Sequence, residues 1–360
     1  MNTRRTCKTL AAIALGGLLL ASGSALAEDK LKVGFVYVGP IGDHGWSYQH
    51  DQGRLALEKT LGDKVETVFV EKVAEGADAE RAITRLARQG AGLIFTTSFG
   101  FMNPTLKVAK KFPKVKFEHA TGFKRSRNVA TYNARFYEGR YINGQIAAKQ
   151  SKSGVAGYIA SFPIPEVVMG INAFLLGAQT VNPDFRLKVV WVNSWFDPGK
   201  EADAAKVLIG QGADILTQHT DSTAPMQIAN EKGVFAFGQA SDMIKFGPKA
   251  QLTAIINNWA PYYIDRTKAV LDGSWSSMDS WRGLAAGTVR MAAYTNMPVS
   301  VAKSAAETEA KIRSGALHPF QGPIYKQDGS LAVPAGETMD DGTLLGMNWY
   351  VKGIDGKLPQ

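Results

Sequence analysis

Residues 32–50 read KVGFVYVGPIGDHGWSYQH, in which an apolar run gives way to a glycine-rich turn and then to the start of an amphipathic segment. The apolar run is typical of a buried strand and the amphipathic segment of a helix, so the stretch predicts a strand, a turn and a helix in direct succession. The turn needs only glycine and a capping residue such as Asp43. It also contains Trp46. Because this large aromatic side chain is costly to expose, another part of the protein or a ligand must cover it.

The same alternation continues along the chain in two successive series, with a restart at Arg135. Strands that alternate with helices of this length predict parallel sheets with helices on both faces. We therefore expect two similar lobes, with a ligand cleft between the carboxyl ends of their strands. The first series has strands at 32–38, 65–73, 91–98, 114–122 and 128–134 and helices at 47–61, 75–90 and 103–113; the second has helices at 136–150, 165–181, 198–212 and 224–233 and strands at 153–161, 187–194, 213–220, 234–239 and 251–258.

The first 27 residues form a segment of a different kind. They have a basic start, an apolar middle and a small-residue ending, Ala25-Leu26-Ala27, which is the layout of a secretory signal peptide cleaved after Ala27. The apolar run is shorter than the ~20 residues that a membrane span needs. The only cysteine, Cys7, lies in this segment. We therefore expect a periplasmic mature chain that can form no disulfide.

The totals are those of an ordinary globular protein, with 360 residues, 45% hydrophobic residues and a net charge of +9. The length predicts about two domains at ~150 residues each. The basic excess is spread along the chain, which argues against a nucleic-acid-binding protein. The five histidines lack metal-ligand spacing, and neither dinucleotide-binding nor phosphate-loop motifs are present, so we expect no metal and no cofactor. His119 and His219 fall at predicted strand ends, where we expect them to be hydrogen-bonded or solvated.

Tryptophan and phenylalanine recur at the predicted strand ends beside hydroxyl, amide and carboxylate groups, a pairing that suits a flat, partly polar ligand. With these residues in place, the chain resembles the basic membrane protein family of periplasmic substrate-binding proteins, which serve ABC importers of nucleosides and purines. The resemblance covers the whole chain after the signal segment. It rests on five fragments in the right order, at residues 32–47, 95–122, 128–148, 191–216 and 234–242.

The resemblance implies an α/β, type I periplasmic-binding-protein fold, with two Rossmann-like lobes and a ligand cleft at a three-strand hinge. The N-terminal lobe would span 28–134 and be completed by roughly 258–290; the C-terminal lobe would span 135–257 and be completed by roughly 291–360. The implied partners are a purine and the membrane permease of an ABC transporter, and the protein would be a monomer without enzymatic activity.

In such proteins an aromatic residue from each lobe sandwiches the purine. The family segments D-x-S-F-N and G-S-F-x-D-P match residues 43–47 and 193–198, which gives Trp46 and Trp195 the two stacking positions. Thr121 stands where nucleoside-binding members carry a ribose-gripping aspartate, and its hydroxyl makes only weaker, neutral hydrogen bonds. The family's asparagine after the first aromatic is Ser47, and its lysine after the last crossing strand falls on Asn257 or Asn258.

These departures remove groups directed at the sugar and enlarge both stacking faces. They predict a free nucleobase (adenine, hypoxanthine or guanine) as ligand, with a nucleoside as the alternative. The expected ligand-binding set is Asp43, Trp46, Ser47, Phe101, Thr121, Trp195, Asp221, Gly238, Asp242 and Asn257.

Two further functions compete with this hypothesis. An exported nucleoside hydrolase would need a tight cluster of aspartates, whereas the candidate aspartates are scattered over both lobes. A receptor for a sensor kinase would share the fold and stays open. The basic run 123–128, FKRSRN, is either a solvated loop or a permease-docking surface.

Overall fold

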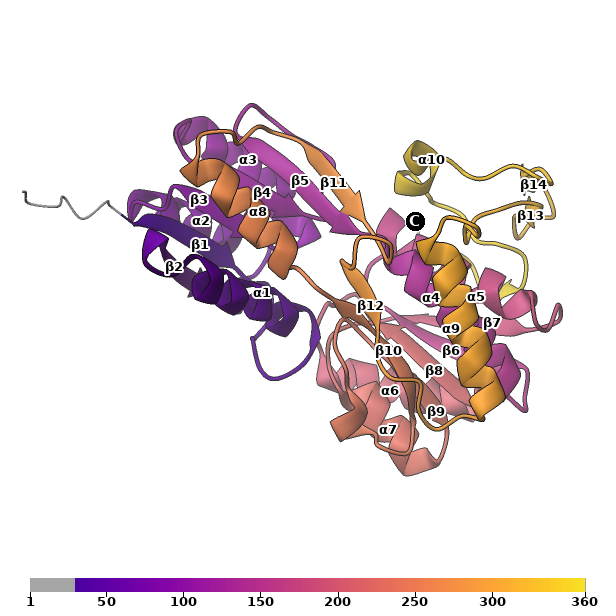
Figure 1. Cartoon of the computed structure of the whole chain (residues 1–360). Helices are drawn as coiled ribbons and strands as arrows, with labels where there is room; N and C mark the ends of the chain where they lie inside the picture. The colour runs from indigo at the N-terminus through magenta and orange to yellow at the C-terminus, as the bar shows by residue number, and fades with distance from the viewer. Residues whose placement is uncertain (1–29, 360) are drawn as a thin grey trace, which may run out of the picture.

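The computed structural model describes residues 30–359, so the expected signal segment and cleavage site lie outside the described residues. Two α/β lobes are present, each built on its own sheet (Figure 1). The first sheet has the strand order β11-β5-β4-β3-β1-β2, and all of its pairings are parallel. Its lobe contains β1 (Leu31–Val36), α1 (Gly45–Leu61), β2 (Val65–Val70), α2 (Ala77–Arg88), β3 (Leu93–Thr96), α3 (Met102–Lys111), β4 (Lys116–Ala120), β5 (Val129–Ala134), α8 (Ala260–Leu271) and β11 (Asp279–Arg282).

The second sheet has the order β12-β10-β9-β8-β6-β7-β15, and only the pairing of β10 with β12 is antiparallel among its described strands. Its lobe contains α4 (Phe136–Gln150), β6 (Val155–Ala160), α5 (Pro165–Gln179), β7 (Arg186–Trp191), α6 (Pro198–Gly210), β8 (Ile215–His219), α7 (Ala224–Lys232), β9 (Phe235–Gly238), β10 (Gln251–Asn257), β12 (Val289–Met291), α9 (Val299–Arg313), β13 (Ile324–Tyr325), β14 (Leu331–Val333), α10 (Asp341–Leu345) and β15 (Ile354–Asp355). Short 3-10 turns lie at Gly62–Lys64, Phe99–Phe101 and Ile244–Phe246.

The chain passes between the two lobes at three places: from β5 to α4, from β10 to α8, and from β11 to β12. Figure 1 shows α8 and β11 in orange beside the indigo and magenta elements of the first lobe, although both come late in the sequence. The sequence placed the last boundary near residue 290, and β12 pairs with β10 from Val289 onward. Each lobe is therefore assembled from segments that are distant in sequence.

The core follows from the apolar strand runs. Strand β3 is buried along its whole length, as expected for a parallel strand covered by helices on both faces. In the second lobe, α4 and α5 approach so closely that a Cβ at Gly144 would overlap the Phe174 carbonyl, and one at Gly177 would overlap the Tyr141 carbonyl. Glycine therefore permits the close packing that fixes α4, and with it the buried Arg140.

Candidate functional site

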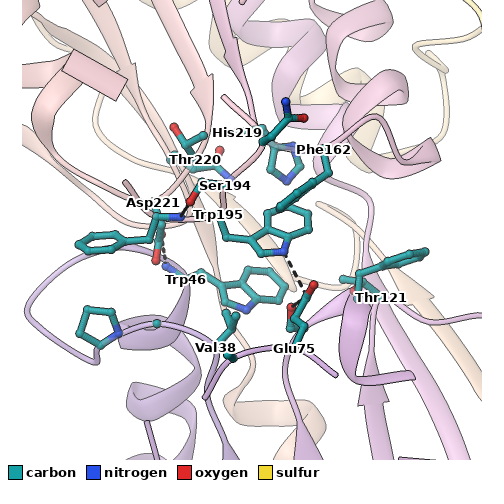
Figure 2. A pocket seen from close by; sticks show the side chains of 18 of the residues that line it. Val38, Trp46, Glu75, Thr121, Phe162, Ser194, Trp195, His219, Thr220 and Asp221 are labelled. Carbon is teal, nitrogen blue, oxygen red and sulfur yellow. Dashed lines mark hydrogen bonds between the residues drawn. The ribbon is translucent and has the colours of Figure 1, made fainter. Parts of the chain in front are cut away.

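A cavity of about 520 Å³ lies between the lobes, at the carboxyl ends of the parallel strands (Figure 2). Its volume is within the range of about 300–1,000 Å³ that is usual for small-molecule sites. The first lobe contributes Val38, Trp46, Glu75, Ser98, Phe99 and Thr121. The second contributes Phe162, Glu166, Trp195, His219, Asp221 and Gln239, among others.

The two lobes each place one tryptophan in the cavity. Trp46 lies in the first turn of α1, its indole Nε1 donates to the Thr97 carbonyl at 2.6 Å, and its ring packs edge-on against His50 at 4.3 Å between centroids. Trp195, in the loop between β7 and α6, packs against Phe162 at 5.0 Å between centroids. Figure 2 shows the two indoles inside the cavity, one from each lobe. The arrangement supplies aromatic surface on both sides of the cleft.

The start of α1 is capped by the opposite lobe. Within the described chain, its own N-cap residue, His44, makes no side-chain capping bond. Instead the Gly45 N–H donates to Ser241 Oγ at 2.7 Å, and the Trp46 N–H donates to Asp221 Oδ1 at 2.5 Å. The first amides of a helix need acceptors and favour negative charge. The second lobe therefore completes a helix of the first.

Gly45 is required for this contact. Its φ of +83° is a conformation that other residues rarely adopt, and a Cβ at this position would overlap the Asp221 carboxylate. Burial raises the pKa of Asp221 well above the usual carboxyl value, more than the hydrogen bonds from the Trp46 and Ser47 amides lower it. The carboxyl is thus costly to ionise while the lobes are in contact.

Two glutamates in the cavity also bridge the lobes. Glu75 accepts from Ser98 Oγ at 2.5 Å, from the Gly100 amide at 2.9 Å and, across the cleft, from Trp195 Nε1 at 3.1 Å (Figure 2). Because α2 starts only at Ala77, Glu75 lies in the loop that follows β2.

Glu166 is in the first turn of α5 and accepts from Asn133 Nδ2 of the first lobe at 3.2 Å. Its Oε1 is 3.4 Å from His219 Nε2. Burial lowers the pKa of His219, which keeps the imidazole neutral. A carboxylate oxygen accepts, so this contact favours the tautomer that carries the proton on Nε2. No partner of Nδ1 is found among the residues that the structure describes.

Four of the ten sequence-predicted residues line this cavity: Trp46, Thr121, Trp195 and Asp221. Thr121 has a φ of +63°, and its hydroxyl donates to the Ala120 carbonyl at 2.7 Å. Asp221 is occupied by the capping bond to α1. The tryptophans thus present their ring faces, whereas the polar groups of Thr121 and Asp221 are partly committed to the protein.

The other six lie outside the cavity lining. Asp43 is exposed and pairs with Lys245 of the second lobe at the edge of the cleft. Ser47 is buried, and its Oγ accepts from the Gly39 amide at 3.2 Å. Phe101 lies in the first-lobe core, Gly238 is the last residue of β9, Asp242 binds the Ile244 amide and Gln251, and Asn257 is buried without a side-chain partner in the described chain.

Sequence reasoning missed three charged residues that line the cavity, Glu75, Glu166 and Lys72, and it left Gln239 out of the binding set. Glu75 and Glu166 were read as the opening residues of helices, and no residue spacing marks either as a ligand group. Gln239 was visible as the residue that follows a predicted strand. No group of three or more His, Cys, Asp or Glu side chains that could hold a metal ion occurs within residues 30–359. None of the helices in the same range is long and apolar enough to cross a membrane.

The model of the family described as ABC transporter substrate-binding protein, PnrA-like (Bmp), matches residues 30–317. This chain belongs to that family. It is similar to a purine-binding protein of Brucella abortus, with 68% identity over 346 residues, which is 96% of this chain and 99% of the relative. It is also 35% identical over 338 residues, 94% of this chain and 83% of the relative, to a Haloferax volcanii protein named provisionally as an ABC transporter glucose-binding protein.

A crystal structure of an ABC transporter solute-binding protein from Aeropyrum pernix superposes with a TM-score of 0.69 at 20% identity, covering 87% of this chain and 95% of that one. The chain has the type I periplasmic-binding-protein fold that the sequence predicted. Membership of a substrate-binding family makes it a binding protein rather than an enzyme. The nucleoside hydrolase alternative is therefore set aside.

Proposed function

We propose that this protein binds a purine as the free nucleobase between its two lobes and delivers it to the permease of an ABC importer. The family supports the transport role, and the 68% identity to a relative named as purine-binding supports the ligand class. Export by the segment 1–27 would place the protein, as a monomer, in the periplasm, where it can collect a solute for the permease.

The observation that carries the proposal is the pair of tryptophans from opposite lobes in one cavity of about 520 Å³. A purine is flat and aromatic on both faces, and stacking on an aromatic side chain contributes about 1–3 kcal/mol per base. With the lobes in contact across the cleft, Trp46 and Trp195 would lie against the two faces of the base. Donors and acceptors such as Gln239 and His219 would then address the purine edge.

The state of two cavity carboxylates favours a base over a nucleoside. Ribose hydroxyls are gripped best by a carboxylate with free lone pairs. Asp221 caps α1, and Glu166 is held between Asn133 and His219. Glu75 accepts its three hydrogen bonds from the protein through Oε1, so its Oε2 is the oxygen that a ribose hydroxyl would use if a nucleoside bound. Thr121, in the place of the family's aspartate, offers only a hydroxyl oxygen.

Mass spectrometry of the small molecules released by denaturing the purified protein tests the proposal. We expect adenine, hypoxanthine or guanine in about equimolar amount with the chain. Recovery of an intact nucleoside would replace the nucleobase with the alternative ligand. Recovery of a sugar, the class named for the Haloferax volcanii relative, would contradict the purine assignment.

A further inference from the structure

Gln239 directly follows the last residue of β9 and lines the cavity. Among the described strand ends of the second sheet, it is the one residue with a side-chain amide that also contacts a buried arginine. Its Oε1 accepts a hydrogen bond from Arg140 Nη2. No hydrogen bond from its Nε2 to another part of the protein is found within residues 30–359. Gln239 itself is only 6% exposed. The nitrogen is not among the fully buried unpaired atoms of the described chain, so it is accessible from the cavity. A ligand that covered it without offering an acceptor would leave it as a costly unpaired donor.

Arg140 is held rigidly behind Gln239. It projects from α4, is fully buried, and donates through Nη1 to Thr217 Oγ1 at 3.0 Å and through Nη2 to the Gln218 carbonyl at 2.6 Å. Its guanidinium also lies over the Tyr158 ring, 5.3 Å from the centroid. The two hydrogen bonds and the stacking on Tyr158 fix the position of the guanidinium beside Gln239.

The chemistry of the two groups fixes the orientation of the amide. A guanidinium carries five N–H donors and no acceptor, whereas a glutamine amide has an oxygen that accepts and an NH2 that donates. The amide must therefore turn its oxygen to Arg140. The NH2 group is then directed away from Arg140, on the cavity side of the residue.

We infer that Arg140 is a positioning residue for ligand specificity: it locks the Gln239 amide with its NH2 toward the cavity, so that the site requires a hydrogen-bond acceptor on the purine edge that faces Gln239. This inference rests on the proposed function and names the feature of the ligand that the same site selects. His219 lines the cavity from the neighbouring strand β8, but its Nδ1 is buried, so the polar group that this inference assigns to the ligand edge is the Gln239 NH2.

The test uses pairs of purines that share their stacking faces and differ in one edge group. Adenine differs from 1-deazaadenine at N1, from 3-deazaadenine at N3 and from 7-deazaadenine at N7. Each base is titrated calorimetrically into the ligand-free full-length mature protein and into Arg140→Met, Arg140→Lys and Gln239→Glu. Gln145→Glu, the same change on α4 but outside the cavity lining, is the matched control.

We expect the wild type to prefer the acceptor-bearing member of at least one pair by about tenfold or more, because an unpaired buried donor is costly. Arg140→Met frees the amide to turn and should bring that ratio close to one, whereas Arg140→Lys, which keeps a donor, should partly restore it. Gln239→Glu should remove the same preference, and Gln145→Glu should leave it unchanged. If Arg140→Met does not fold, as judged by circular dichroism, Gln239→Glu alone decides.

A wild type that discriminates in none of the pairs would overturn the inference, and so would Arg140→Met or Gln239→Glu variants that weaken every base equally. Failure of the proposed function gives a different result in the same titrations: no purine binds the wild-type protein at all. In that case neutron diffraction of the ligand-free protein decides the orientation directly. Gln239 nitrogen facing Arg140 contradicts the lock, and oxygen facing Arg140 supports it.

Discussion

The two walls of the cavity differ in the polar groups that they present: main-chain amides at the start of α1 on the first lobe, and side chains on the second. The first lobe presents Trp46 and the main-chain N–H groups at the start of α1. Within the described residues, the N-cap residue of α1 makes no side-chain hydrogen bond to these groups. The second lobe presents acceptors and donors on side chains, such as Asp221 and Gln239, whose positions are set by buried partners. The first amides of α1 donate to acceptors of the second lobe, and Glu75 of the first lobe accepts from Trp195 of the second, so bringing the lobes together satisfies polar groups on both walls. The comparison indicates that lobe contact and ligand recognition are coupled through a few named groups.

The largest effect is expected from Gly45→Ala. The new Cβ would overlap the Asp221 carboxylate and hold the lobes apart, so that both capping bonds and one stacking face are lost. We expect purine affinity to fall about 100- to 1,000-fold, since two hydrogen bonds between the lobes and one stacking contact are removed together. Gly42→Ala is the matched control, because Gly42 also has a positive φ of +52° but nothing lies within 4 Å of a Cβ there. Calorimetry in which both variants bind alike would show that Asp221 does not gate closure.

The stacking pair comes next. Trp46→Ala and Trp195→Ala should each weaken purine binding by about 1–3 kcal/mol, the usual loss when a base loses an aromatic partner, or about 5- to 150-fold. Trp191→Ala, a half-buried tryptophan on β7 outside the cavity lining, should change thermal stability without changing affinity. Unchanged calorimetric affinity in both cavity variants would rule out the sandwich.

A smaller effect is expected from pH. Burial raises the pKa of Asp221 while the lobes are in contact, so the contact favours the protonated carboxyl. The free energy that the Asp221 contact contributes to lobe closure is complete below the ordinary carboxyl pKa of about 4. It is lost as pH rises toward the raised pKa of Asp221. We expect wild-type affinity to fall about three- to tenfold between pH 5 and pH 8. Asp221→Asn keeps an acceptor for the Trp46 amide and should flatten the profile; parallel profiles for the two proteins would contradict the assignment.

The smallest effect belongs to the ion pair between Asp43 and Lys245, which joins the two lobes at the exposed edge of the cleft. Exposed pairs contribute little and are screened by salt. Asp43→Asn should therefore weaken binding less than about threefold at low salt and not measurably at high salt. A loss as large as that of a tryptophan variant would return Asp43 to the ligand-binding set.

The two-lobe architecture could be predicted from the sequence because apolar strand runs and helical periods are local signals. The placement of two tryptophans in the cavity could be predicted as well, since Trp46 and Trp195 occupy strand-end positions that the family pattern marks. The helix at 136–150 has the predicted bounds. No elements were predicted after residue 258. The region contains two regular helices, α8 and α9, but its strands β11, β12 and β15 are short and join sheets begun much earlier in the chain.

The remaining site depends on contacts that no local pattern contains. Asp221 meets the Trp46 amide across 175 residues of sequence, so its capping role follows only from the folded arrangement. Strand-end position places a residue at the right edge of a sheet but does not decide which way its side chain points. Asp242 and Asn257 therefore qualified by sequence position, yet they lie outside the cavity lining.

The central claim, a nucleobase held between the two lobes, is tested most directly by paired calorimetric titrations. Adenine, hypoxanthine and guanine are titrated into the ligand-free protein beside adenosine, inosine and guanosine. The account predicts that each base binds more tightly than its own nucleoside, because Thr121 cannot replace a ribose-gripping carboxylate. A nucleoside that binds tenfold more tightly than its base would contradict the account and make the cavity a nucleoside site.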